Sequence, residues 1–229
     1  MSVASLPIHL VLPAFNEAEV LAEVVEEIRK WVDCPIIVID DGSTDQTSTV
    51  ARAAGVRVVR HPINRGAGAA CMTGITLARQ QGWPCVAFMD ADGQHNPQDL
   101  IRLHETMIAH EADLIIGSRF LQKAPNIPVL RRFYNAIANL LTNAFSTNRY
   151  SDTQSGFRLL NRKAIEKIDL LQDEFSYCSE MIIQAEMEQL KVVECPINVR
   201  YTSYSMRKGQ DFQVGVRTAF HFLWKLIFK

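Results

Sequence analysis

The sequence has few cysteines, and the five that it has are scattered along the chain. They form no C-x-x-C pair, and an odd number suits neither a disulfide framework nor a zinc knuckle. We therefore expect a protein with reduced thiols that is made and kept in the cytoplasm. The cysteines are Cys34, Cys71, Cys85, Cys178 and Cys195.

Long apolar runs are also missing. No segment reaches the roughly 18 apolar residues that a membrane-spanning helix needs, and the N-terminus lacks the basic start and apolar stretch of a secretory signal. A formal net charge of −1 gives no general attraction to polyanions. These absences exclude a membrane-spanning protein and argue against a nucleic-acid partner, so any affinity for a membrane must be local.

Two common nucleotide-binding fingerprints are absent as well. The run NRGAGAA, residues 64–70, follows the third predicted strand, and Cys71 occupies the place of the third glycine in G-x-G-x-x-G. The sequence contains no G-K-[ST] triplet. Dehydrogenases of the Rossmann type and P-loop NTPases are therefore disfavoured, although the small residues of this run would let a ligand approach the backbone closely.

Short apolar runs alternate with longer amphipathic stretches through the first half of the chain. This alternation predicts an α/β fold with a mostly parallel, Rossmann-like central sheet. The first helix is predicted to start at Asn16, with Glu19 as its capping partner, and to end at about Trp31. Ser43 and Asn96 carry similar helix-start signals. The predicted strands are 8–12, 36–39, 56–59, 85–89 and 114–116.

The second half of the chain is less regular. It predicts helices over about 130–145 and 179–189, a polar turn at 151–156 and a strand near 192–199. In the segment 211–229, Arg217, His221 and Lys225 recur at every fourth position beside an aromatic and aliphatic arc. This pattern predicts an amphipathic helix in the headgroup region of an anionic membrane. The alternative is a helix docked on the protein itself or on a partner.

Polar motifs follow three of the predicted strands at the points where the strands end. They are PAFNE at 13–17, DDGSTD at 40–45 and DADGQH at 90–95. The carboxyl ends of parallel strands share one edge of a sheet, and ligands of open α/β sheets bind there. We therefore expect the three motifs to converge on one crevice.

The acidic residues of these motifs suggest a metal and a nucleotide. Asp90 and Asp92 stand two residues apart on an extended segment, so their carboxylates point to the same side and, with the Gln94 amide oxygen, suit Mg²⁺ or Mn²⁺. An ordinary solvated turn explains them about as well. Asp41 could accept hydrogen bonds from a nucleobase or ribose, or could only brace its loop. His95 has no second histidine at ligand spacing, so we expect it to support the metal ligands.

Taken together, the ordered motifs VLPAFNE, IIVIDDGSTDQT, NRGAGAA, FMDADGQHNP, GSRF and DTQSGFRLL resemble the family 2 glycosyltransferases. Within that family the chain resembles the polyprenyl-phosphate (dolichyl-phosphate) mannosyl- and glucosyltransferase branch, from about Ile8 to Arg207. The resemblance implies one A-type glycosyltransferase domain over 1–210. Its nucleotide-sugar half would be about 1–120 and its acceptor half about 121–210, with the amphipathic helix at 211–229.

The resemblance also implies roles for individual residues. A nucleotide-diphosphate sugar would contact Pro13, Phe15, Glu17, Ile39, Asp41, Ala70, Asp90, Ala91, Asp92, Gln94 and Arg119. The Mg²⁺ or Mn²⁺ ion would be held by Asp90, Asp92 and Gln94. An acceptor phosphate would contact Arg131, Arg132, Arg158, Arg207 and Lys208. The catalytic residues would be Asp92, Arg119, Asp152 and Arg207.

The chain departs from the family pattern at two places that bear on the donor. Phe15 stands where many relatives carry tyrosine, and the loop YTSYSMRKGQ, residues 201–210, differs from the mannosyltransferase form. The first change removes a hydroxyl and keeps an aromatic ring. The identity of the donor sugar therefore stays open.

The expected reaction is an inverting, metal-dependent transfer of a hexose from a GDP- or UDP-sugar to a polyprenyl phosphate. An alternative sends the sugar to a hydroxyl of a glycan or glycolipid, which requires a general base, with Asp152 and Glu180 as candidates. Another is a non-catalytic sugar-nucleotide-binding or membrane scaffold protein. We expect the protein on the cytoplasmic face of a membrane, with an integral membrane protein or a second copy of the chain as a partner.

Overall fold

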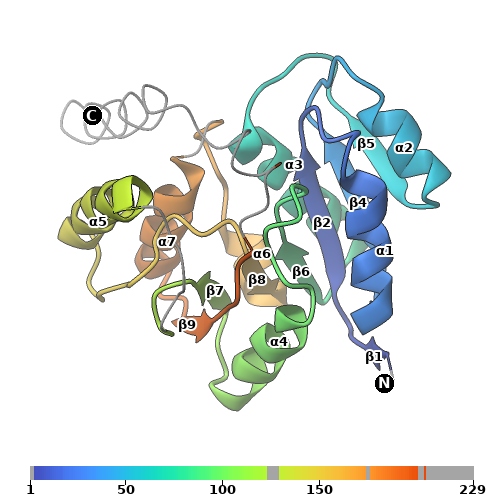
Figure 1. Cartoon of the computed structure of the whole chain (residues 1–229). Helices are drawn as coiled ribbons and strands as arrows, with labels where there is room; N and C mark the ends of the chain where they lie inside the picture. The colour runs from blue at the N-terminus through green and yellow to red at the C-terminus, as the bar shows by residue number, and fades with distance from the viewer. Residues whose placement is uncertain (1–2, 123–128, 174–175, 201–203, 205–229) are drawn as a thin grey trace.

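The computed structural model describes residues 3–122, 129–173, 176–200 and 204, and the side chains of 129–134 lie outside this description. Strands and helices alternate through the first half as the sequence predicts (Figure 1). The strands are β1 Ala4–Ser5, β2 His9–Ala14, β3 Val32–Asp33, β4 Ile36–Asp40, β5 Arg57–Arg60, β6 Cys85–Phe88, β7 Leu114–Ser118, β8 Arg158–Asn161 and β9 Val192–Pro196. The helices are α1 Leu21–Trp31, α2 Thr47–Ala53, α3 Ala67–Gln81, α4 Asp99–Ala109, α5 Val129–Ala144, α6 Arg162–Lys167 and α7 Tyr177–Met187.

One sheet runs through both halves of the described chain, with strand order β5-β4-β2-β6-β8-β7-β9. β2 pairs in parallel with β4 and β6, β5 extends this block beside β4, and β9 is parallel to β7. β8 is antiparallel to both of its neighbours, β6 and β7. The predicted mostly parallel sheet is confirmed, whereas the sequence pattern does not predict β8 or α6.

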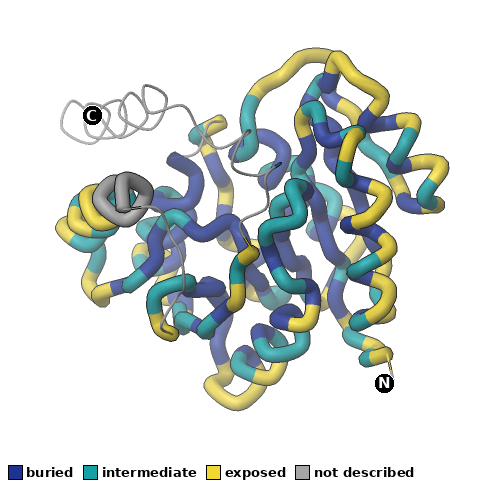
Figure 2. The backbone as a smooth tube through the Cα atoms, in the orientation of Figure 1, coloured by how far each residue is buried: buried dark blue, intermediate teal, exposed yellow. Residues whose placement is uncertain are grey.

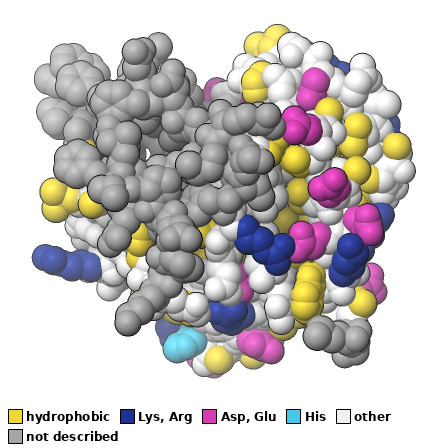
Figure 3. Space-filling view, in the orientation of Figure 1, with side chains coloured by type: hydrophobic (Ala, Val, Ile, Leu, Met, Phe, Trp, Pro, Cys, Tyr) yellow, Lys and Arg dark blue, Asp and Glu magenta, His cyan; other side chains and the backbone are white. Residues whose placement is uncertain are grey.

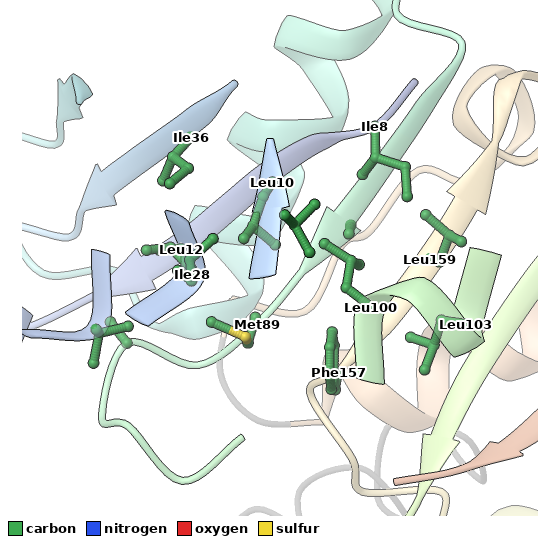
Figure 4. Close-up of a cluster of buried hydrophobic side chains, with 14 of the residues drawn as sticks. Ile8, Leu10, Leu12, Ile28, Ile36, Met89, Leu100, Leu103, Phe157 and Leu159 are labelled. Atoms are coloured by element: carbon green, nitrogen blue, oxygen red, sulfur yellow. The ribbon is translucent and has the colours of Figure 1, made fainter. Parts of the chain in front are cut away.

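Helices cover both faces of the sheet because strand side chains point alternately to its two sides. On β2, Leu10 and Leu12 face the core completed by α1, α2 and α4, whereas Val11 faces the core of α3, α6 and α7. Figure 4 shows the first core, where Ile28 of α1 and Leu100 of α4 lie among strand side chains. The inner strands of the sheet, such as β4 and β7, are buried, and most exposed residues lie on the outer helix surfaces, on loops and on the edge strand β5 (Figure 2).

Asn16 and Ser43, which were predicted to cap helices, join two loops and cap no helix. Helix α1 begins at Leu21 without a side-chain cap, so the start predicted at Asn16 is wrong. The Asn16 side-chain oxygen accepts the backbone N–H of Thr44 at 2.8 Å, and the Asn16 N–H donates to the Ser43 hydroxyl at 2.9 Å. The start predicted at Ser43 is wrong for the same reason, since α2 has no side-chain cap. These residues pair loop 13–17 with loop 40–46 across two neighbouring strands.

The described residues contain no helix long and apolar enough to cross a bilayer. The predicted helix at 211–229 lies outside the described residues. On the described surface that faces the viewer in Figure 3, lysine and arginine side chains lie among aspartate and glutamate side chains. This mixed surface agrees with the near-zero net charge.

A groove of about 650 Å³ lies at the amino ends of β4 and β5, on the edge of the sheet opposite the predicted motifs. Its lining includes the stacked rings of His9 and Trp83, whose centroids are 4.1 Å apart. None of the predicted site residues that the structure describes lines this groove.

Candidate active site

The loops that follow β2, β4 and β6 lie along one edge of the sheet. The parallel register pairs Ala14 with Asp40, the last residues of β2 and β4, and it pairs Val11 with Phe88 at the end of β6. The predicted convergence of the three polar motifs on one edge is therefore confirmed. Because β8 runs the other way, the segment 151–157 that precedes it reaches the same edge.

Asp90, the first residue of the motif 90–95, lies against the segment 151–157. Its side chain is 49% exposed, and its Oδ2 lies 3.1 Å from Nε2 of His95. A Cβ at Gly156 would lie 2.7 Å from Asp90 Oδ1, so only glycine allows this approach. The His95 ring is buried against the ring of Phe157, at a centroid distance of 5.0 Å. His95 therefore orients Asp90, as we expect for a residue that supports a metal ligand.

Asp90 and Asp92 influence each other's protonation. Burial raises the pKa of Asp92, and the charge of Asp90 raises it further. Burial also raises the pKa of Asp90, but the hydrogen bond and charge of His95 and the charge of Arg119 outweigh it, so the pKa is lowered. The charge of Asp90 therefore opposes the ionisation of Asp92, and a divalent cation would relieve this repulsion.

The oxygen atoms of this turn fit a hard cation that also binds substrate. Asp92 accepts the Gln94 N–H at 3.0 Å, and the Gln94 side-chain amide donates to the other Asp92 oxygen. In the described part of the chain, no group of three histidine, cysteine, aspartate or glutamate residues forms a closed metal site. Mg²⁺ and Mn²⁺ are commonly held by one or two carboxylates together with substrate phosphates. The residues present thus suit an open site.

Arg119 forms a bidentate ion pair with Asp152. Its Nε and Nη2 donate to the two carboxylate oxygens at 2.7 and 2.8 Å, and its backbone N–H donates to Oδ2 at 2.9 Å. Asp152 is fully buried, whereas 19% of the Arg119 side chain is exposed. The guanidinium is therefore held in one orientation. The candidate role of Asp152 as a general base is corrected, because both of its oxygens already accept hydrogen bonds from Arg119.

Glu180, the other candidate base, also serves the fold. Its two oxygens accept the backbone N–H groups of Leu171 and Gln172 at 3.0 and 2.9 Å. These bonds hold the segment that leads from α6 to α7. Both candidate bases therefore use their carboxylate oxygens in hydrogen bonds within the protein.

Arg158 does not reach the surface of the molecule. It is fully buried at the start of β8, and its side chain donates to the carbonyl oxygens of Ser155 and Thr153 at 3.0 and 2.9 Å. Its Nη1 has no hydrogen-bond partner among the described residues. The predicted contact of Arg158 with an acceptor phosphate is therefore wrong; the residue instead fixes the turn that carries Gly156.

Asp41 braces its surroundings, which was one of its two predicted roles. Its carboxylate is 3% exposed and accepts the backbone N–H groups of Arg65 and Gly66, the latter at 2.6 Å. His61 Nδ1 lies 2.7 Å from the same carboxylate. Asp40 is likewise buried and accepts the Ser43 N–H at 2.9 Å. The geometry therefore supports bracing for both, and not an open contact with a base or ribose.

The segment 172–173 packs against the small residues at the start of α3. A Cβ at Gly68 would lie 2.0 Å from the carbonyl oxygen of Gln172, and the Gly68 N–H donates to the Asp173 carbonyl at 2.8 Å. The expectation that a ligand approaches this backbone is corrected, because the segment 172–173 fills the space. Three further residues predicted to contact the nucleotide sugar have core side chains: Ile39, Ala70 and Ala91.

The first motif contacts a residue that the sequence does not single out. The Tyr204 hydroxyl donates to Glu17 Oε2 at 2.7 Å and to the Asn16 carbonyl at 3.3 Å. Burial raises the pKa of Tyr204, and its bond to Glu17 raises it further. Phe15 is 38% exposed. Pro13 pairs with Ile39 in the parallel register of β2 and β4, one residue before the last pair.

Four residues predicted to contact the acceptor phosphate have side chains outside the part of the chain that the structure describes. The side chains of Arg131 and Arg132 at the start of α5 lie outside the description, and so do Arg207 and Lys208.

The sequence pattern also misses a group of polar residues behind Arg119. These side chains link β7, α5 and β9 to the segment 151–153. Glu194 has a sequence signal of its own, since it is a charged residue inside the apolar strand VVECP, and Ser118 and Ser151 lie in the GSRF motif and the predicted polar turn 151–156. The group comprises Ser118, Asn139, Ser151 and Glu194.

Comparison with known proteins adds a family and a fold. The family model "Glycosyl transferase family 2" matches residues 9–169. The UDP-N-acetylglucosamine–dolichyl-phosphate N-acetylglucosaminyltransferase of Methanococcus voltae is 28% identical, over 94% of either chain. The polyprenol monophosphomannose synthase of Mycolicibacterium smegmatis is 33% identical, over 82% of this chain and 75% of its own.

A solved structure shows the same fold. Glucosyl-3-phosphoglycerate synthase from Mycobacterium tuberculosis, in complex with Mn²⁺, UDP and glucosyl-3-phosphoglycerate, superposes with a TM-score of 0.72. The match covers 93% of this chain and 75% of that one, at 21% sequence identity. The predicted A-type α/β fold and the resemblance to the polyprenyl-phosphate branch are confirmed by these matches.

Proposed function

Because the chain belongs to glycosyl transferase family 2 and is a glycosyltransferase, we propose that it transfers a hexose from a nucleotide-diphosphate sugar to a polyprenyl phosphate. The observation that carries this proposal is the Arg119 guanidinium, held in one orientation by Asp152, because the segment 151–157 that carries Asp152 also meets Asp90 at Gly156. A fixed cation beside a metal-binding turn suits substrates that carry phosphate groups.

The donor end of the site would use the acidic turn. Asp90, Asp92 and Gln94 would hold Mg²⁺ or Mn²⁺, which supplies charge stabilisation to the departing diphosphate. His95 keeps the Asp90 carboxylate in place through its 3.1 Å contact. Arg119 can add the bidentate contact that guanidinium groups make with phosphate. The related fold of glucosyl-3-phosphoglycerate synthase was solved with Mn²⁺ and UDP, which supports this choice of donor class.

We infer the class of acceptor from the hydrogen bonds that the two candidate bases already make. A sugar hydroxyl must lose a proton during transfer, so a general base is needed near it. Asp152 and Glu180 are both engaged in bonds to the protein. A phosphate monoester is already anionic at neutral pH and needs only to be oriented by cations. The name of the M. voltae relative contains dolichyl phosphate and that of the M. smegmatis relative contains polyprenol monophosphomannose, which agrees with a phosphate acceptor.

The proposed reaction is a single displacement. A phosphate oxygen of the acceptor forms a bond with the anomeric carbon, and the bond from that carbon to the nucleoside diphosphate breaks. The nucleoside diphosphate leaves with the electron pair of the broken bond. Because the acceptor oxygen attacks from the face opposite the leaving group, the configuration at the anomeric carbon inverts. Because the acceptor lipid resides in a membrane, we place the protein at its cytoplasmic face, with the basic segment 211–229 as the contact to anionic lipid.

The test is a transfer assay with the full chain. The protein is incubated with Mg²⁺ or Mn²⁺, with GDP- and UDP-hexoses in turn, and with a polyprenyl phosphate. We expect one donor to release nucleoside diphosphate and to yield a sugar lipid that partitions into organic solvent. Turnover that requires a saccharide acceptor, with no lipid product, would reject the polyprenyl phosphate and favour the hydroxyl alternative.

A further inference from the structure

The orientation of Arg119 depends on its buried partner Asp152, whose backbone is in turn hydrogen-bonded by another side chain. Asp152 binds the guanidinium through both oxygens at 2.7 and 2.8 Å. Asp152 has no exposed surface, so it can turn only if its backbone moves. The position of the segment 151–152 therefore sets the direction in which the guanidinium points.

Glu194 of β9 holds this segment by its backbone. Its Oε1 accepts the N–H groups of Ser151 and Asp152 at 3.0 and 2.9 Å, and its Oε2 accepts the Ser151 N–H at 2.9 Å. The Ser151 hydroxyl donates to Oε1 at 2.9 Å. A carboxylate can accept all of these bonds, because it has two oxygens and no hydrogen to present. A glutamine has one acceptor oxygen and would direct an N–H₂ group at a backbone N–H.

A chain of hydroxyl groups leads from Glu194 back to the strand that carries Arg119. The Ser118 and Ser151 hydroxyl oxygens are 2.6 Å apart. Because Ser151 donates its hydrogen to Glu194, Ser118 donates to Ser151 and in turn accepts the Phe120 N–H at 3.2 Å. Both residues that flank Arg119 are thus tied to the same carboxylate.

From this geometry we propose that Glu194 is a positioning residue, which fixes the Arg119 guanidinium for a substrate phosphate by holding Ser151 and Asp152. The inference rests on the proposed function for the identity of that phosphate. Glu194 itself touches no substrate in this proposal. Its effect on the reaction passes entirely through Arg119.

The chain offers a matched control in Glu186 of α7. Its carboxylate accepts the backbone N–H groups of Thr147 and Asn148 and the Tyr150 hydroxyl at 2.9 Å. It therefore braces the same connection between α5 and β8 with a similar number of bonds. No bond joins it to Ser151, Asp152 or Arg119 in the described structure.

The first experiment measures kcat/KM for Glu194→Gln and Glu186→Gln, each alone and combined with Arg119→Ala. We expect Glu194→Gln to lower kcat/KM roughly ten- to hundredfold, because small misplacements of an orienting group have large effects. In the Arg119→Ala background, Glu194→Gln should lower kcat/KM by less than about twofold. The reason is that the effects of two residues that act through the same guanidinium do not add. Glu186→Gln should stay within about threefold. Equal losses with and without Arg119 would overturn the proposal.

The second experiment does not depend on turnover. In ¹⁵N-labelled protein, the Nε–H resonance of Arg119, identified by its loss in Arg119→Lys, reports the bond to Asp152. We expect this resonance to shift or broaden in Glu194→Gln and to stay unchanged in Glu186→Gln. An unchanged resonance in Glu194→Gln overturns the positioning role, whatever the activity. If the wild type transfers no sugar but the resonance responds as expected, the proposed function fails and the positioning role stands.

Discussion

The acidic residues at the carboxyl edge of the sheet fall into two groups, those exposed enough to bind a ligand and those buried in hydrogen bonds with the protein. Asp90 is half exposed and Asp92 is partly exposed, whereas Asp41 and Asp152 are buried and accept bonds from backbone or arginine. A buried carboxylate is stable only when its oxygens are satisfied by the protein. The residues open to a ligand are therefore those of the turn 90–94.

Replacing Asp92 by asparagine should abolish turnover and leave the fold intact. The change removes a charge that would face the cation, while the side chain can still accept the Gln94 N–H. We expect at least a hundredfold loss of activity and of Mn²⁺ affinity, with unfolding free energy altered by less than about 1 kcal/mol. Calorimetric titration with Mn²⁺ and urea unfolding measure both. Asp33→Asn at the opposite edge is the control, and full activity of Asp92→Asn would remove its metal role.

Gly156→Ala should damage the site more than the fold. The new Cβ would lie 2.7 Å from Asp90 Oδ1, and the half-exposed carboxylate can move aside. We expect activity to fall about tenfold or more while stability changes by less than about 1 kcal/mol. Gln154→Ala, in the same loop, should keep its activity within about threefold. Normal Mn²⁺ affinity and turnover in Gly156→Ala would show that this close approach is incidental.

At the scale of elements, the start of α3 is a docking surface for the segment 171–173. The Gly68 and Ala69 N–H groups donate to the Asp173 carbonyl, and Arg65 pairs with the Asp173 carboxylate at 3.2 Å. The first N–H groups of a helix lack partners within the helix. Here a distant segment satisfies them, so α3 is tied to the connection between α6 and α7.

Gly68→Ala should therefore destabilise the protein, although alanine favours helices. Its Cβ would lie 2.0 Å from a backbone carbonyl oxygen, which cannot move without displacing the segment. We expect a loss of roughly 1–3 kcal/mol or more in urea unfolding, as in other overpacked positions. Gln80→Ala on the exposed side of α3 should change stability by less than about 0.5 kcal/mol. A stabilised Gly68→Ala protein would contradict the docking.

Asp113 ties the ends of three strands together. Its carboxylate accepts the Asn161 side-chain amide, the Lys163 ammonium and the Lys191 backbone N–H, each at 2.9 Å. Burial alone raises the pKa of Asp113, but these bonds and the Lys163 charge outweigh it and lower the pKa. The ionised carboxylate thus stabilises the fold at the end of the sheet opposite the candidate site.

This lowered pKa predicts a loss of stability in acid. A group whose folded pKa lies below its unfolded value stabilises the fold above the unfolded value, about 4 for aspartate. The contribution is lost as the pH falls through the folded pKa. We expect Asp113→Asn to cost roughly 1–2 kcal/mol at pH 7 and much less at pH 3. Urea midpoints of both proteins between pH 7 and pH 3 provide the check, and a constant difference would contradict it.

Regular elements were predictable where their pattern depends on local chemistry. The strands at 36–40 and 114–118 are apolar runs between turn signals, and both were expected within two residues of their ends. β8 escapes prediction because its four residues follow a polar turn directly and lead at once into α6. The helix caps at Asn16 and Ser43 fail because a capping side chain can equally bond a neighbouring loop.

At the scale of the whole molecule, one reversed strand joins the two halves of the chain. β8 lies between β6 and β7 and antiparallel to both, so its amino end meets their carboxyl ends. The segment 151–157, from the second half of the sequence, thereby reaches the acidic turn of the first half. Arg119 and Asp152 become a pair, although they stand 33 positions apart.

Deletion of residues 212–229 tests the membrane contact predicted from the sequence. Removing these basic and aromatic residues should reduce co-sedimentation with phosphatidylglycerol vesicles by severalfold, and the binding of the full chain should weaken with salt. Phosphatidylcholine vesicles are the control for charge. If the shortened protein sediments with anionic vesicles as well as the full chain does, the segment has a structural role instead.

The sequence by itself determined the family, the parallel α/β sheet and the gathering of polar motifs at one edge, because strand periodicity and motif order are local properties of the chain. Only the tertiary structure decided which of those polar residues face outward. It buried Arg158, turned Asp41 and Asp152 into braces, and brought Glu194 behind Arg119. These outcomes depend on strand order and on segments that pack from far along the chain. A side chain's role follows from the partners it meets there.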